Sequence, residues 1–181
     1  MRIISGNKKS FIVTAPKNIN ARPTTDKVKE SLFNIIQNKY EFSSIKVLDI
    51  FAGTGNISYE FGSRGCSDIL CVDNNLKCIK FINKTAKNLN FQIRTKKIDY
   101  LSFLNHSNEQ FDIVFADPPY SFDLDHYLKI IDSIKKNEKL NAGGQLIIEH
   151  SSNISFIDKF TEVEERNYGS NCLSFFKKAS L

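Results

Sequence analysis

Four consecutive residues, Asp117-Pro118-Pro119-Tyr120, carry the groups needed to grip an exocyclic amino group on a nucleobase. The Asp117 carboxylate and the Pro118 carbonyl can accept its two N–H bonds, while the ring of Tyr120 holds the base in plane. Two acceptors favour the pyramidal nitrogen, whose lone pair can then attack an electrophile. The alternative for so short a motif is a rigid turn in which Asp117 only caps and Tyr120 only packs.

The apolar run before this loop, residues 111–116, predicts a buried strand, because it is short, contains β-branched and aromatic residues, and ends at a turn signal. The two prolines stop both strand pairing and helix, since each lacks an N–H and has φ fixed at about −65°. Each also restricts the residue before it to extended geometry. The loop is therefore expected at the carboxyl end of a strand, where open α/β sheets bind ligands.

A second candidate site is the glycine turn that follows residues 45–51, another expected strand. Gly53 and Gly55 let the backbone approach a ligand closely at the N-terminus of the next helix. A dinucleotide fingerprint would need a third glycine where Ser58 stands. The turn indicates a Rossmann-like sheet without requiring a dinucleotide.

Acidic and aromatic residues around that turn favour a nucleoside with a small charged tail. Asp49 opens the turn and the bulky Phe51 lies within it. Asp73 ends the next expected strand, where an acid conventionally binds ribose hydroxyls, although it could also cap the following helix. Asp99 and Tyr100 follow a weaker strand and are placed to meet the edge and face of an adenine. On its own, Asp99 would be interpreted as a turn residue.

The order of elements along the chain predicts an open, mostly parallel α/β sheet. Strand and helix patterns alternate, with turn residues at 141–144 before the fifth strand and a final hairpin through residues 168–171. The expected strands are 45–51, 68–73, 91–98, 111–116, 145–149, 156–166 and 172–176, and the expected helices of the main domain are 57–64, 74–90 and 122–138.

The positive charge is concentrated in residues 1–40, which hold eight Lys or Arg and two acidic residues. Residues 41–181 hold 17 Lys or Arg and 18 acidic residues. We interpret residues 1–40 as an extension of the main domain, which residues 41–181 form. Its charge favours an anionic polymer as partner over a merely solvated basic face. A small hairpin is expected there, with Lys8 and Lys9 at its tip for phosphate contacts.

A helix should follow Pro23, capped by a threonine or an aspartate and running to about Tyr40. Its apolar stripe would cover the edge or top of the main domain. The polar residues expected on the opposite face are Lys27, Lys29, Glu30 and Asn34.

The totals indicate one ordinary globular domain: 181 residues, 41% hydrophobic and 25% charged. No apolar run is long enough to span a membrane and the first residues are not a signal peptide, so a cytoplasmic protein is expected. The four cysteines and three histidines have no metal-ligand spacing, which favours reduced thiols, no disulfide and no metal. These cysteines are Cys66, Cys71, Cys78 and Cys172.

With these parts in order, the sequence resembles the class I methyltransferases that use S-adenosylmethionine, and more closely the RsmD family of bacterial 16S rRNA (guanine-N2)-methyltransferases. The resemblance implies a Rossmann-like fold, with a mostly parallel seven-stranded sheet, helices on both faces, and a small N-terminal hairpin and helix. The segments that carry it are Arg2-Ile3-Ile4-Ser5-Gly6, residues 22–34 beginning Arg22-Pro23-Thr24-Thr25-Asp26, residues 47–55, Ser63-Arg64-Gly65 and Asp117-Pro118-Pro119-Tyr120.

The resemblance also implies roles for individual residues. Binding of S-adenosylmethionine would fall to Asp49, Phe51, Gly53, Gly55, Asp73, Asp99 and Tyr100. Catalysis would fall to Asp117, Pro118, Pro119 and Tyr120. RNA binding would fall to Arg2, Lys8, Lys9, Arg22, Thr24 and Thr25. The sequence departs from the family at Asn56 and Ser58, where small residues are usual, and at Tyr100, where alanine is commoner.

The reaction implied is direct transfer of the sulfonium methyl to N2 of a guanine in 16S rRNA, within the small ribosomal subunit, by a monomeric enzyme. A DNA adenine-N6 or cytosine-N4 methyltransferase would use the same grip, but such enzymes usually carry a separate target-recognition region. A non-catalytic RNA-binding module on the same fold would not need an intact Asp-Pro-Pro-Tyr loop. Hydride transfer has no use for that loop either, so a dehydrogenase is a distant alternative.

Overall fold

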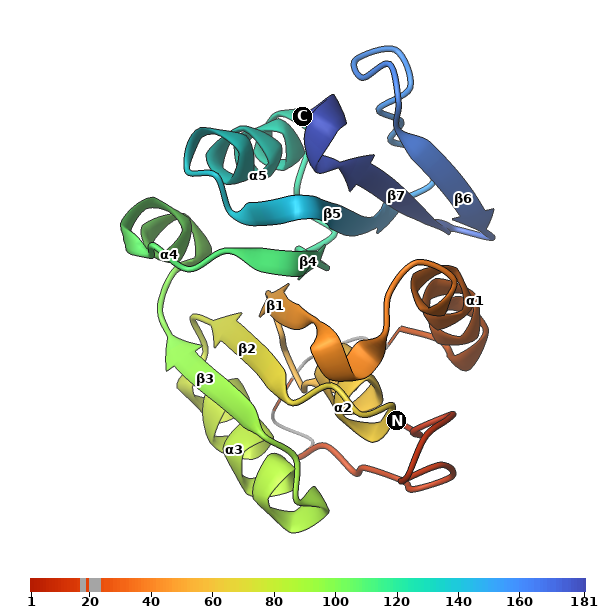
Figure 1. Ribbon diagram of the computed structural model, residues 1–181, viewed down its shortest axis with the longest axis vertical. Helices are drawn as coiled ribbons and strands as arrows, with labels where there is room; N and C mark the ends of the chain where they lie inside the picture. Colours follow the sequence, from red (N-terminus) through yellow and green to blue (C-terminus); the bar gives the residue numbers. More distant parts are fainter. Residues whose placement is uncertain (17–18, 20–23) are drawn as a thin grey trace.

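The computed structural model describes residues 1–16, 19 and 24–181. A seven-stranded sheet forms its centre, with the strands in the order β3-β2-β1-β4-β5-β7-β6 (Figure 1). Strands β1 to β5 are parallel, and β7 runs antiparallel to both of its neighbours. The strands are β1 (Lys46–Ile50), β2 (Asp68–Asp73), β3 (Ile93–Lys97), β4 (Phe111–Ala116), β5 (Leu140–Ser151), β6 (Glu164–Tyr168) and β7 (Asn171–Lys177).

Helices cover both faces of the sheet, as expected (Figure 1). Side chains alternate between the faces along a strand. In β1, Val47 packs in one core with α1, α2 and α3, whereas Leu48 and Ile50 pack in the other with α4 and α5. The helices are α1 (Asp26–Gln37), α2 (Asn56–Ser63), α3 (Leu76–Leu89), α4 (Tyr100–His106) and α5 (Leu124–Lys136), with short 3-10 turns at Phe42–Ser44 and Lys178–Ser180.

The strand order places a ligand site between β1 and β4. The chain moves outward from β1 to β2 and β3 on one side, then returns to add β4 and β5 on the other. Open sheets bind ligands at the carboxyl ends of the strands on either side of such a reversal. The glycine turn after β1 and the Asp117 loop after β4 therefore lie at the same edge of the sheet.

Three details of the predicted fold were wrong. Residues 141–144 do not form a turn before the fifth strand, because they belong to β5, where the register with β4 shifts and Gly143 adopts a φ of 75°. Residues 156–166 do not form one strand: only Glu164 onward pairs in the sheet. Helix α4 was not anticipated, and Asp99 is its N-cap, accepting from the Ser102 amide at 3.1 Å.

The N-terminal hairpin is present in minimal form, with a single antiparallel bridge between Arg2 and Ile12. The Ile3 amide donates to the Phe11 carbonyl at 3.0 Å, and the chain turns between them, with Lys8 half-buried and Lys9 exposed. Within the described ranges, no helix has the length and apolar character needed to cross a membrane.

Candidate active site

A cleft of about 590 Å³ opens at the carboxyl ends of β1, β2 and β4. The structure brings the predicted catalytic and cofactor residues together in it, with the exception of Gly55, which is the N-cap of α2 beside it. The predicted residues that line it are Asp49, Phe51, Gly53, Asp73, Asp99, Tyr100, Asp117, Pro118, Pro119, Tyr120 and, from the RNA-binding group, Thr24.

The glycine turn is fastened to the end of β2 by one carboxylate. Asp73 accepts from the Gly53 amide at 2.8 Å with Oδ2 and from the Asn75 amide at 2.7 Å with Oδ1. The N-cap of α3 is Asn75, which accepts from the Lys77 amide at 2.9 Å, so the alternative role of Asp73 as a helix cap was wrong. Asp73 is held at the cleft, with lone pairs left for a ligand hydroxyl.

The Asp49 carboxylate lies at the base of the cleft and is only 2% exposed. Burial raises its pKa to about 7; the hydrogen bond from Ser58 opposes this rise, and the nearby Asp73 adds to it. The Ser58 hydroxyl donates to Asp49 Oδ2 at 2.6 Å. The serine that departs from the family pattern therefore orients the acid at the start of the glycine turn. A positively charged ligand in the cleft would favour the ionised form of Asp49.

An aromatic wall flanks these carboxylates. The ring centroids of Phe51 and Tyr100 lie 4.6 Å apart, and Phe122 meets Phe51 edge-on at 5.8 Å. Phe51 has a φ of 65°, a left-handed conformation that a bulky residue adopts only under constraint, and such outliers cluster at ligand sites. Asp99 stands at the edge of this wall, so the arrangement suits a flat base with a donor at its rim.

The Asp117 loop forms the opposite wall. Asp117 is half-buried, Pro118 is buried, and the Tyr120 ring is 48% exposed. The Tyr120 hydroxyl donates to Asn171 Oδ1 at 3.3 Å. Burial, together with the charges of Asp117, Tyr120 and Glu149, raises the pKa of the Tyr127 hydroxyl behind the loop to about 12. The wall therefore offers an acid, a carbonyl and an exposed ring to a second ligand.

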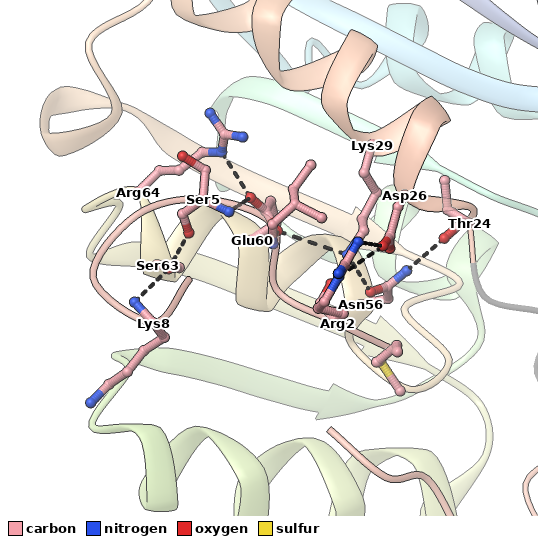
Figure 2. Close-up of polar contacts among 12 residues, drawn as sticks. Arg2, Ser5, Lys8, Thr24, Asp26, Lys29, Asn56, Glu60, Ser63 and Arg64 are labelled. Atoms are coloured by element: carbon pink, nitrogen blue, oxygen red, sulfur yellow. Dashed lines mark hydrogen bonds and ion pairs between the residues drawn. The ribbon is translucent and has the colours of Figure 1, made fainter. Parts of the chain in front are cut away.

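Lys29 was expected on the solvent face of α1, and that prediction was wrong (Figure 2). Its side chain is buried; Nζ donates to the Arg2 carbonyl and, at 3.1 Å, to Asn56 Oδ1, and it lies 3.8 Å from Glu60 Oε2. Burial lowers the pKa of Lys29, and the Glu60 carboxylate opposes that shift. Asn56 in turn donates from Nδ2 to the Thr24 carbonyl at 3.2 Å.

Glu60 also fixes the N-terminal segment on α2 (Figure 2). Its Oε2 accepts from the Ile4 amide at 2.9 Å, and its Oε1 accepts from the Ser5 amide at 3.1 Å and from Arg64 Nε at 3.0 Å. One turn further, the Ser63 hydroxyl donates to the Ser5 carbonyl at 2.6 Å. The basic segment is thereby attached to the helix that starts at the cleft.

Of the predicted RNA-binding residues that the structure describes, Arg2, Thr24 and Thr25 lie at the start of α1, apart from Lys8 in the hairpin turn (Figure 2). Arg2 pairs with Asp26 at 2.7 Å. Thr25 is the N-cap of α1, and Thr24 is buried at the cleft. Arg22 lies outside the described residues, and the RNA contacts of the group stay a prediction.

Sequence reasoning gave no site role to five residues that line the cleft or hydrogen-bond to a residue that lines it. Glu149 carried a usable signal, because an acid at the carboxyl end of an apolar strand is the same pattern that identified Asp73. Asn171 and Phe122 carried none, since their places depend on how β7 and α5 pack. The five residues are Lys29, Asn56, Phe122, Glu149 and Asn171.

Comparisons with known proteins find a matching family and similar sequences. A sequence model of the family described as Conserved hypothetical protein 95 matches residues 1–177. Ribosomal RNA small subunit methyltransferase D of Buchnera aphidicola subsp. Acyrthosiphon pisum is 31% identical over 159 residues, which cover 86% of this chain and 80% of that protein.

Two solved structures share the fold. A hypothetical protein of Thermus thermophilus superposes with a TM-score of 0.84 at 23% identity, over 97% of this chain and 98% of that one. The 16S rRNA N2 methyltransferase RsmC of T. thermophilus, in complex with AdoMet and guanosine, gives a TM-score of 0.70 at 16% identity, over 87% of this chain and 44% of that one.

Proposed function

The chain belongs to the Conserved hypothetical protein 95 family, the RsmD family of rRNA methyltransferases, and from this premise we propose that it methylates N2 of a guanine in 16S rRNA with S-adenosylmethionine as donor. One observation carries the proposal: the glycine turn with its acids and the Asp117 loop line the two walls of one cleft. A donor held on the first wall and an amino group held on the second would meet there.

The first wall fits S-adenosylmethionine chemically. The buried Asp49 would face its positively charged methionine part, Asp73 its ribose hydroxyls, and Asp99 its adenine amino group beside the rings of Phe51 and Tyr100. Bound there, the donor would supply an electrophilic methyl on a cationic sulfonium. The relative RsmC, solved with AdoMet and guanosine, supports this pairing of ligands.

The second wall would prepare the nucleophile. Asp117 and the Pro118 carbonyl accept the two N–H bonds of guanine N2, which frees its lone pair, and Asp117 stabilises the positive charge that develops there. Holding the reacting atoms in position can supply roughly 7–11 kcal/mol of the barrier. Removing the base from its stack costs a few kcal/mol, and stacking on Tyr120 returns about 1–3 kcal/mol.

A labelled-methyl assay tests the proposal. Purified protein and labelled S-adenosylmethionine are incubated with small subunits that lack the modification, with naked 16S rRNA, and with duplex DNA. We expect label in N2-methylguanosine, most strongly from the subunits. The proposal takes the enzyme to act as a monomer. Label in adenine or cytosine of DNA, or no transfer to any substrate, would overturn it.

A further inference from the structure

A chain of hydrogen bonds runs behind the second wall of the cleft and joins it to Thr24, which also lines the cleft. The Tyr120 hydroxyl donates to Asn171 Oδ1 at 3.3 Å. Asn171 Nδ2 then donates to Glu149 Oε1 at 2.7 Å, and the other oxygen of Glu149 accepts from the Thr24 hydroxyl at 3.0 Å. The two ends of this chain, Tyr120 and Thr24, line the cleft, whereas its two middle members do not.

The two middle residues of this hydrogen-bond chain lie in the central sheet, the rigid part of the fold. Glu149 lies in β5 and Asn171 begins β7, and these strands are paired antiparallel over seven positions, ending at Ser151 and Asn171. Ala116 of β4 is in register with Ile148, so the acids that follow, Asp117 just after β4 and Glu149 within β5, lie side by side.

The two end residues of this hydrogen-bond chain, in contrast, lie in segments outside the sheet. Tyr120 lies in the loop after β4 with a ring that is 48% exposed, and Thr24 precedes the N-cap of α1. Glu149, Asn171 and Thr24 are 2%, 6% and 8% exposed, so their polar atoms have little access to water. A buried polar group that loses its partner is costly, which makes such a network stiff when it is complete.

We propose that Glu149 and Asn171 are positioning residues for the target base: they hold Tyr120 and Thr24 at a fixed separation and so set the slot in which the base stacks. The inference rests on the proposed function, because it takes Tyr120 as the surface on which the guanine lies. Neither Glu149 nor Asn171 contacts the base. Their effect is transmitted through the Tyr120 hydroxyl on one side and the Thr24 hydroxyl on the other.

A double-mutant cycle tests the Tyr120 side. Tyr120→Phe removes the hydroxyl and keeps the stacking ring, and Asn171→Ala removes its acceptor. Each should lower kcat/KM on small subunits by about tenfold or more, since small misplacements of a reacting group are expensive. The double variant should be no worse than Asn171→Ala alone, because both changes break the same link. Asn167→Ala on the exposed part of β6 is the matched control and should behave as wild type.

A binding measurement separates positioning from general damage. The dissociation constant for S-adenosylhomocysteine, measured by calorimetry, should stay within about twofold of wild type in each variant, because the first wall is not part of the chain. Thr24→Val removes only a hydroxyl and tests the other end. If Asn171→Ala does not fold, the Thr24→Val and Tyr120→Phe variants still test the proposal.

The possible outcomes distinguish the two proposals. Additive losses in the double variant, or full activity in both Tyr120→Phe and Thr24→Val, overturn the positioning role while wild-type transfer to rRNA still stands. Equal losses of kcat/KM and of S-adenosylhomocysteine affinity overturn it as well, since they indicate a merely structural role. Wild-type protein that transfers no methyl to rRNA overturns the proposed function and this inference with it.

Discussion

Lys29 Nζ lies 3.8 Å from Glu60 Oε2, and both side chains are buried where α1, α2 and the N-terminal segment meet. The two ends of this pair are not equivalent. Glu60 also accepts from Arg64 and from the amides of Ile4 and Ser5, whereas the acceptors bonded to Lys29, the Arg2 carbonyl and Asn56 Oδ1, are neutral. Removing the acid therefore leaves a buried cation without its ion pair, while removing the cation leaves the acid with three donors.

We expect Glu60→Gln to lower the free energy of unfolding by about 3–5 kcal/mol, because it leaves the Lys29 ammonium uncompensated. Lys29→Met should cost less, about 1–3 kcal/mol, since Glu60 keeps its other partners. Urea unfolding followed by circular dichroism measures both, with Lys27→Met on the exposed face of α1 as the matched control. Equal costs for the two variants, or the reverse order, would contradict this account.

Asp49 predicts a pH dependence of ligand binding. Its pKa is raised to about 7 by burial, so the acid is protonated in much of the ligand-free protein at neutral pH. A group whose pKa is raised on folding stabilises the fold most below its ordinary pKa and loses that contribution as the pH rises through about 7. The cationic S-adenosylmethionine favours the ionised form, so its binding should strengthen over the same window and release a proton.

We expect the affinity for S-adenosylmethionine to rise by about tenfold between pH 6 and pH 8. Calorimetry in two buffers of different ionisation enthalpy should detect the released proton near pH 7. Asp49→Asn should bind more weakly and with a flat pH profile, because nothing at that position titrates. Ser58→Ala should move the midpoint to higher pH, because the hydrogen bond that it removes favours the ionised acid. A flat wild-type profile would refute this role of Asp49.

The sequence predicted well the edge of the sheet that carries the candidate site, because the sequence signals for that edge are local. The run over β4 and the two prolines after it determine a strand and its end without reference to the rest of the chain. The glycine turn after β1 is equally self-contained. Since parallel strands present their carboxyl ends together, two local motifs were enough to predict one cleft.

What the sequence did not predict depends on partners far along the chain. Helical periodicity assigned Lys29 to solvent, and only the packing of α1 on α2 brings Glu60 to it. The glycines at 143–144 predicted a turn, but they lie within β5, where the register between β5 and β4 shifts. Two of the departures from the family pattern are explained in the same way, since Ser58 donates to Asp49 and Asn56 accepts from Lys29.

Asp117 should be indispensable for turnover but not for binding of the donor. We expect Asp117→Ala to lower kcat by at least about a hundredfold, because it removes both an acceptor for the amino group and the charge that stabilises the transition state. The affinity for S-adenosylhomocysteine should change little, since the donor would lie on the opposite wall. Labelled-methyl transfer and calorimetry measure the two quantities, with exposed Asp125→Ala as control. Unchanged turnover would refute the grip.

Gly6 provides a way to lift the basic turn from the main domain. It has a φ of 81°, and a Cβ there would lie 1.9 Å from the Ser63 carbonyl oxygen, a backbone atom that cannot move aside cheaply. The Asn7 amide donates to that same oxygen at 2.7 Å, so the turn sits directly on the end of α2. Gly6→Ala must therefore displace the turn that carries Lys8 and Lys9.

We expect Gly6→Ala to weaken binding to 16S rRNA and to flatten the salt dependence of log K by about 0.7–0.9 for each phosphate that the displaced turn no longer neutralises. Gly143→Ala is the matched control, because Gly143 has a similar φ of 75° but nothing within 4 Å of an added Cβ. Both variants carry the strain of a left-handed alanine, so only the displacement of the turn separates them. Filter binding across a salt series measures the slopes. Identical slopes for the two variants would show that the hairpin turn does not bind phosphates.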